Sequence, residues 1–123
     1  VQFGNIIATG TVTITGETII GPATIVNKVA GYTLALADHG KIVEMNVGSP
    51  VQITVPPNTD VEFPIGTQIN VMQYGAGKVQ VAQGAGVVVR GTPGLYLRAQ
   101  YSSATLIKRA TNEWYLIGDL SAS

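Results

Sequence analysis

The stretch that decides the fold is residues 101–120, which read YSSATLIKRATNEWYLIGDL. Two short runs rich in β-branched, aromatic and other apolar residues, Ala104–Arg109 and Trp114–Gly118, flank the polar residues 111–113 (TNE). Runs of this length on either side of a polar turn are typical of a β-hairpin. We therefore expect the chain to end in two antiparallel strands.

The same punctuated pattern continues toward the N-terminus. In the run VQITV (51–55), apolar residues alternate with polar ones, and Pro56-Pro57 ends the run because proline has no N–H to donate to a sheet. Further runs of this kind, separated by Gly, Pro, Asn or Asp, cover 24–29, 32–37, 41–46, 61–65, 67–74, 78–83, 87–90 and 95–100. No window shows the apolar spacing of a capped helix, so the sequence predicts essentially no α-helix. The predicted fold is all-β, a compact antiparallel β-sandwich that is jelly-roll-like.

Two segments resemble each other, MQYGAG (72–77) and VAQGAG (81–86). A repeat of this kind would suit the turns of a β-solenoid. Repeat architectures need about three units to bury a continuous core, and only two copies are visible. We therefore interpret the two segments as similar turns.

The length of 123 residues fits one domain, which can bury roughly 65% of the surface that its unfolded chain exposes. We place that domain at 22–123. Residues 1–21 alternate Val12 and Ile14 with threonines between Gly10 and Gly16, a pattern that predicts an extended N-terminal arm or edge strand. There is no cysteine, which excludes a disulfide framework.

Charge is sparse and balanced. Seven basic and seven acidic residues make up 11% of the chain, against roughly 25% in average soluble domains, while 46% of the residues are hydrophobic. A surface with so few charges predicts a homo-oligomer or a permanently assembled component, unless Thr, Asn, Gln and Ser alone keep a free domain soluble. Zero net charge argues against a nucleic-acid partner, and the apolar runs are far shorter than the roughly 20 residues of a membrane span.

Groups that suit catalysis are few. Asp38-His39 is more typical of a turn before Gly40 than of a catalytic triad, because adjacent residues rarely reach triad geometry. Asp60 and Glu62 lie between prolines in a predicted loop, which favours solvated acids over a glycosidase pair. We expect no enzymatic activity, no cofactor and no metal site.

One group of late aromatic and basic residues is a candidate contact for a glycan or for another subunit. Its members are Tyr96, Arg98, Tyr101, Lys108, Arg109, Trp114 and Tyr115. The alternative for Trp114, which we favour, is an anchor of the core or of a subunit contact, because large aromatic residues dominate burial in small domains.

Most of the chain, from Tyr32 to Leu120, resembles a module of structural proteins of tailed bacteriophages. The resemblance is carried by the run Leu34–Asn46, by Ile53–Pro57 followed by FPIGT (63–67), by the turn 75–77, and by the closing residues 104–106 and 114–120. It implies a non-enzymatic virion component, a homotrimer displayed on the particle surface.

Within that family, the module resembles both head decoration proteins and the terminal pieces of tail fibres. A free-standing domain with an N-terminal arm favours a capsid decoration protein whose partners are the major capsid protein or other virion proteins. The alternative is a tail-fibre or adsorption module that binds a host glycan. For decoration we expect the arm to contact a neighbour through Gln2, Phe3, Ile6, Ile7, Val12 and Ile14.

Overall fold

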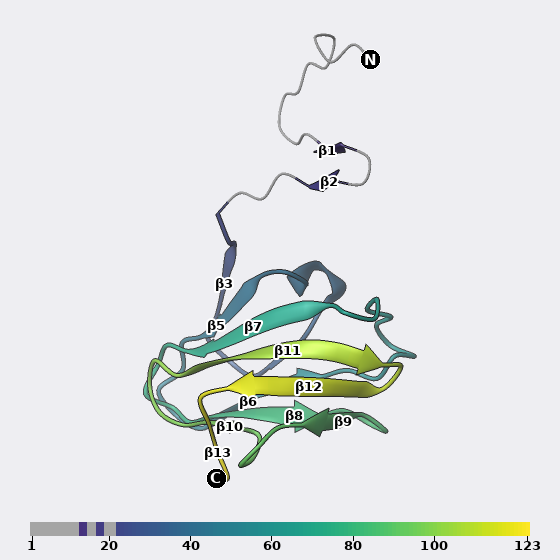
Figure 1. Cartoon of the computed structure of the whole chain (residues 1–123). Coiled ribbons are helices and arrows are strands. Elements are labelled where there is room, and N and C mark those ends of the chain that lie inside the picture. The colour runs from purple at the N-terminus through teal and green to yellow at the C-terminus, as the bar shows by residue number, and fades with distance from the viewer. Residues whose placement is uncertain (1–12, 15–16, 19–21) are drawn as a thin grey trace.

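The structure is a computed structural model that describes residues 13–14, 17–18 and 22–123. Its body consists of two mixed β-sheets packed face to face (Figure 1). The six-stranded sheet has the order β3 (Ile25–Lys28), β5 (Ile42–Met45), β7 (Gln68–Gln73), β11 (Ser103–Ala110), β12 (Glu113–Gly118) and β9 (Val88–Arg90). The five-stranded sheet has the order β13 (Leu120–Ser121), β10 (Tyr96–Leu97), β8 (Val79–Gln83), β6 (Val51–Val55) and β4 (Tyr32–Thr33). The predicted all-β sandwich is thereby confirmed.

The strand directions differ from the predicted antiparallel arrangement. From β3 to β8 the chain alternates between the two sheets, and each strand lies parallel to the strand two places earlier, as β5 does to β7 and β6 to β8. The antiparallel, jelly-roll-like connectivity is therefore wrong for this part of the fold. Alternation of apolar and polar residues reports which face a side chain occupies, and it carries no information about strand direction.

The two GAG segments lie at equivalent corners of this winding. The Gly75 amide donates to the carbonyl of Met45 at the end of β5 (3.0 Å), and the Gly84 amide donates to the carbonyl of Val55 at the end of β6 (2.9 Å). The two segments are therefore similar turns, as the sequence indicates, and each lies at a corner where the chain passes from one sheet to the other. The chain thus makes three successive coils, formed by β3 and β4, by β5 and β6, and by β7 and β8. Parallel pairing of their strands stacks these coils on one another.

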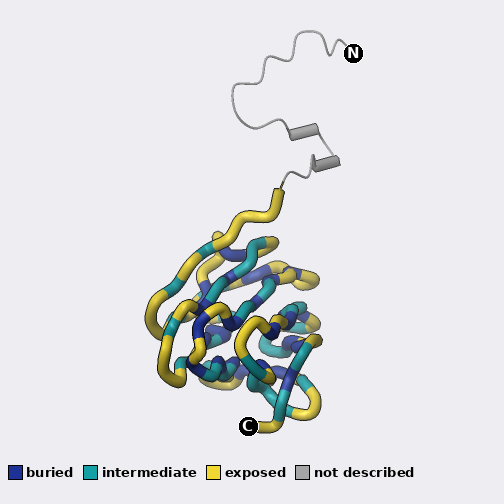
Figure 2. The backbone as a smooth tube through the Cα atoms, turned by 90° about the vertical axis from the view of Figure 1, so that its left-hand side faces the viewer, coloured by how far each residue is buried: buried dark blue, intermediate teal, exposed yellow. Residues whose placement is uncertain are grey.

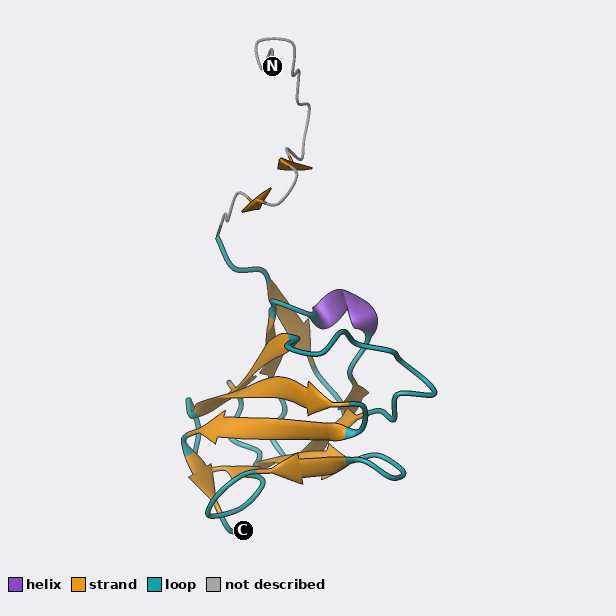
Figure 3. Cartoon of the chain, turned by 45° about the vertical axis from the view of Figure 1, so that its right-hand side comes forward, coloured by secondary structure: helices purple, strands orange, loops and turns teal. Residues whose placement is uncertain are grey.

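The predicted C-terminal hairpin is confirmed. β11 and β12 pair antiparallel with Leu106 opposite Leu116, and a register shift lies between Lys108 and Ala110. β11 also pairs antiparallel with β7, so the hairpin closes the stack of parallel strands. The only helical element in the described part of the chain is one 3₁₀ turn, η2 (Leu36–Asp38), drawn in purple in Figure 3.

The core lies between the sheets (Figure 2). Inward-facing residues of both sheets, such as Val43, Ile53 and Ile69, have no exposed surface. Trp114 is 1% exposed and meets Phe63 edge to face, with ring centroids 5.3 Å apart. The interpretation of Trp114 as a core anchor is therefore confirmed.

The N-terminal region is described only in part. β1 (Thr13–Ile14) and β2 (Glu17–Thr18) pair antiparallel with each other, and Ile14 belongs to β1. The other expected arm contacts, Gln2, Phe3, Ile6, Ile7 and Val12, lie outside the described residues. The boundary between an arm at 1–21 and a domain at 22–123 remains a prediction. Within the described ranges, no helix is long and apolar enough to cross a membrane.

Candidate functional site

The outward side of the six-stranded sheet carries a group of apolar side chains that we call the apolar face. Its members are Ile25, Ile42, Met72, Ile107, Tyr115 and Ile117. Ile25 and Ile117 are each 59% exposed and Tyr115 is 39% exposed, while the other three are half-buried. Exposed apolar side chains gathered on one sheet face are typical of a protein interaction surface.

The strand register places some of these side chains next to one another. Ile25 lies beside Ile42 across β3 and β5, and Ile107 lies opposite Tyr115 across β11 and β12. Outward residues of neighbouring strands have Cβ atoms about 5 Å apart, so the members of each pair lie within contact distance. The hydrogen-bonded pair Asn70 and Thr105 lies between Ile42 and Ile117 on the same face. Among the described residues, β3 is also an edge strand of this sheet, with a neighbouring strand on one side only.

Polar groups on the same side are paired within the chain. The Asn27 amide donates to Glu44 (2.6 Å), and the Thr105 hydroxyl donates to Asn70 (2.7 Å). At the other end, Arg90 and Arg109 both bind Glu113. The hydrogen bond from Arg90 is the largest cause that lowers the pKa of Glu113. These polar groups are therefore already hydrogen-bonded or ion-paired within the chain. A second protein covering this face would need few new polar contacts with them.

Sequence reasoning missed the apolar face, although a signal for it was present. Leu106-Ile107 and Leu116-Ile117 are pairs of consecutive apolar residues within strands. Because consecutive side chains point to opposite sides of a sheet, each pair places one apolar residue inward and one outward. Leu106 and Leu116 are buried, and Ile117 is exposed.

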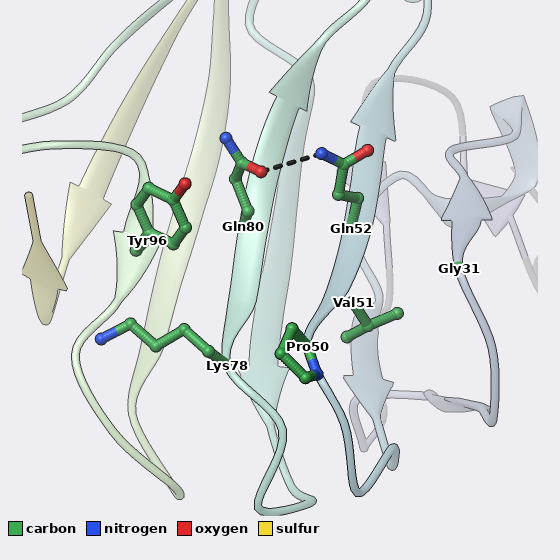
Figure 4. Close-up of a pocket in the computed structure, with 7 residues that line it drawn as sticks. All are labelled: Gly31, Pro50, Val51, Gln52, Lys78, Gln80 and Tyr96. Atoms are coloured by element: carbon green, nitrogen blue, oxygen red, sulfur yellow. Dashed lines mark hydrogen bonds between the residues drawn. The ribbon is translucent and has the colours of Figure 1, made fainter. Parts of the chain in front are cut away.

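A groove of about 720 Å³ lies on the outward side of the five-stranded sheet (Figure 4). Its lining residues are Gly31, Pro50, Val51, Gln52, Lys78, Gln80 and Tyr96. The Gln52 amide donates to the Gln80 side chain (2.8 Å), and Tyr96 stands on the next strand beside Gln80. Lys78 Nζ donates to the Arg98 carbonyl and to Ser121 Oγ, both at 2.9 Å. The groove thus combines uncharged amides, one aromatic ring and one cation.

The predicted late aromatic and basic cluster does not form a single site. Trp114 lies in the core and cannot touch a glycan, and Tyr115 points to the opposite side of the same strand. Tyr96 lines the groove on the other sheet. Tyr101 is 66% exposed and packs edge to face against Tyr74, with ring centroids 6.1 Å apart. Closeness in sequence misled the prediction because these residues belong to different strands and faces.

Two of the three basic members of the cluster, Arg98 and Arg109, also lie apart. Arg98 donates to Asp119 (2.8 Å), and this hydrogen bond is the largest cause that lowers the pKa of Asp119, followed by the one from Ser102. Arg109 lies at the other sheet, where it donates to the Tyr115 hydroxyl (3.0 Å).

The acidic candidates are found in turns and loops. Asp38 is 4% exposed and accepts hydrogen bonds from the Tyr32 hydroxyl (2.6 Å) and the Ala35 amide (2.8 Å), whereas its neighbour His39 is exposed. Burial, followed by the hydrogen bond and charge of Asp38, raises the pKa of Tyr32 to about 12. Asp60 and Glu62 are both exposed, as the sequence predicts.

No group of three or more potential metal ligands occurs among the described residues. Comparison with protein-family models, with curated proteins and with solved structures finds no match.

Proposed function

We propose that this chain is a non-enzymatic structural protein of the bacteriophage virion, a surface module that assembles as a homotrimer and decorates the capsid. The observation that supports it most is the apolar face, where exposed Ile25 and Ile117 lie among polar groups that are already paired. A second copy of the chain is the partner that the proposal assigns to this face.

The free energy of association requires that several apolar side chains are buried in the contact. Burying the exposed part of Ile25 or Ile117 contributes about 1 kcal/mol each, since a fully buried side chain of this size contributes about 1.5–3 kcal/mol. Association costs at least about 4 kcal/mol in lost freedom, so two isoleucines alone do not suffice. The half-buried members Ile42, Met72 and Ile107 belong to the same contact in our proposal.

Light scattering of the full chain tests the assembly. We expect a trimeric mass, and we expect Ile117→Glu to lower it to that of a monomer because a carboxylate in the contact loses its hydration. Leu36→Glu is the matched control, because Leu36 is 52% exposed and lies in η2, outside the strands that carry the apolar face. A wild-type monomer, or equal effects of both variants, would contradict assembly through this face.

Capsid binding tests the decoration role separately. Deleting residues 2–16 should abolish binding to particles and leave the sandwich folded by circular dichroism, because the proposal assigns particle contact to the arm. A truncated chain that still binds capsids would remove the arm from the proposal while leaving the trimer test unaffected.

The groove supports a second candidate function, an adsorption module that binds a host surface glycan. Planar amides and one aromatic ring are groups that bind sugar hydroxyls and sugar ring faces, and the volume of about 720 Å³ falls within the range of ligand pockets. Glycan-array binding that is lost in Tyr96→Ala and kept in Tyr101→Ala would favour this function, because Tyr101 does not line the groove.

A further inference from the structure

Lys108 points into the space between the two sheets. It belongs to the inward side of β11, lies opposite Trp114 on β12, and is only 3% exposed. Phe63 packs edge to face against Trp114 and also contributes to the surroundings of the lysine through its carbonyl. A lysine in this position is rare, since lysines are almost never fully buried unless they are paired.

The amine of Lys108 has neutral partners. Its Nζ donates to Asn58 Oδ1 (2.5 Å) and to the Phe63 carbonyl (2.7 Å). The ion pairs of the described residues involve Arg90, Arg98 and Arg109, and none involves this lysine. Burial lowers the pKa of Lys108, partly opposed by the negative charge of Glu62. The neutral amine, which is the nucleophilic form, is therefore easier to reach here than at a solvated lysine.

The position of Asn58 is fixed from a third segment. Its backbone N–H donates to Asn112 Oδ1 (2.9 Å), and Asn112 lies in the turn between β11 and β12. The side-chain amide of Asn58 is thereby held at the end of the strand that carries Lys108. A nucleophile and a carbonyl group held in contact gain much of the rate advantage of an intramolecular reaction.

We propose that Lys108 and Asn58 join in an intramolecular amide bond. The unprotonated Nζ attacks Cγ of Asn58, the Nζ–Cγ bond forms, and the Cγ–Nδ2 bond breaks. One proton passes from Nζ to Nδ2, which leaves as ammonia, so that atoms and charge balance without any oxidant, reductant or co-reactant.

The surroundings provide a path for the proton and for the leaving group. Asn58, Glu62 and Lys108 line one open cavity of about 260 Å³, through which ammonia can escape to solvent. Glu62 is the acid of this cavity, and we assign to it the transfer of the proton from Nζ to Nδ2. The resulting bond joins β11 of the six-stranded sheet to the segment that follows β6 of the five-stranded sheet.

Mass spectrometry of the purified full chain tests the bond without any substitution. The expected mass is lower than the sequence mass by that of one ammonia molecule. A tryptic digest should contain the peptide 42–78 linked to the peptide 99–109, because modified Lys108 is no longer cleaved. A chain of full sequence mass whose two peptides separate would overturn the proposal.

Variants distinguish this bond from other losses of ammonia, such as cyclisation at another asparagine. Lys108→Arg and Asn58→Ala should each restore the full mass expected for the variant. Lys78→Arg is the matched control and should keep the loss, because Lys78 also donates to a backbone carbonyl but touches no asparagine. A loss of ammonia that persists in Lys108→Arg would overturn the proposal. Glu62→Gln should slow formation of the bond about a hundredfold, and an unchanged rate would overturn the role of Glu62.

Discussion

Replacing Gly77 with alanine is expected to weaken the corner at which the chain passes from β7 to β8. Gly77 packs against the backbone of Ser49 in the preceding turn of the winding, and its amide donates to the Val47 carbonyl (2.8 Å). A Cβ at this position would stand 2.7 Å from Ser49 N and closer still to Ser49 O. Because the obstacle is backbone, neither side can yield without moving the stacked turns apart.

The magnitude follows from two opposing effects. Overpacking costs about 1–3 kcal/mol, and a rigid backbone neighbour places Gly77→Ala near the upper end. Alanine also restricts the unfolded chain, which returns about 0.4–1 kcal/mol. The net loss is about 2 kcal/mol. Gly48→Ala is the matched control, because a Cβ there meets nothing within 4 Å, and this variant should gain about 0.4–1 kcal/mol.

Urea unfolding at one fixed protein concentration measures the difference between the two variants. We expect their free energies of unfolding to differ by about 3 kcal/mol, or roughly 12 °C in melting temperature at about 4 °C per kcal/mol. Equal stabilities of Gly77→Ala and Gly48→Ala would refute the close approach of successive turns and, with it, the parallel winding.

Two further predictions concern buried groups. Trp114→Ala should lower the free energy of unfolding by about 3–5 kcal/mol because it removes the edge-to-face partner of Phe63 from the core, and urea unfolding with a loss below about 1 kcal/mol would contradict this packing. An absorbance titration should find one tyrosine with a pKa of about 12, and Asp38→Asn should lower it, because burial and Asp38 hold Tyr32 in its neutral form. The stability that this raised pKa contributes is fully present below pH 10.0, the usual pKa, and is lost as the pH rises toward 12. A normal titration of all tyrosines would contradict the buried hydrogen bond.

The sequence predicted the strands better than their arrangement. Alternation of apolar and polar residues, interrupted by turn residues, located β6 and the hairpin of β11 and β12. Both are local signals in the sequence. The parallel pairing of β5 with β7 joins residues that are far apart in the chain, and no local pattern specifies it. The GAG repeat at 75–77 and 84–86 was the sequence signal for this parallel arrangement. Because only two copies are visible, the sequence analysis did not interpret the repeat in this way.

The surfaces were harder to predict for the same reason. A strand pattern assigns Tyr115 and Trp114 to opposite sides, but it does not say which residues of other strands share each side. The contact between Lys108 and Asn58 joins positions 50 residues apart, and in the sequence each is an ordinary polar residue. The sequence predicts Lys108 as a cation on the surface, whereas in the structure it is buried and its amine donates to neutral partners.

The two candidate functions use opposite sides of the sandwich and therefore do not compete for space. The apolar face belongs to the six-stranded sheet, whereas the groove with Tyr96 belongs to the five-stranded sheet. In our proposal, other copies of the chain cover the apolar face, and the groove stays exposed to solvent. Ile117→Glu should then separate the trimer while each groove keeps its intrinsic affinity. A multivalent glycan surface would bind this monomer more weakly, by the avidity factor of about 10²–10⁴ that linked sites provide. A soluble monovalent glycan should bind the monomer and the trimer equally, and a groove that loses this affinity together with the trimer would show that the subunit contact completes it.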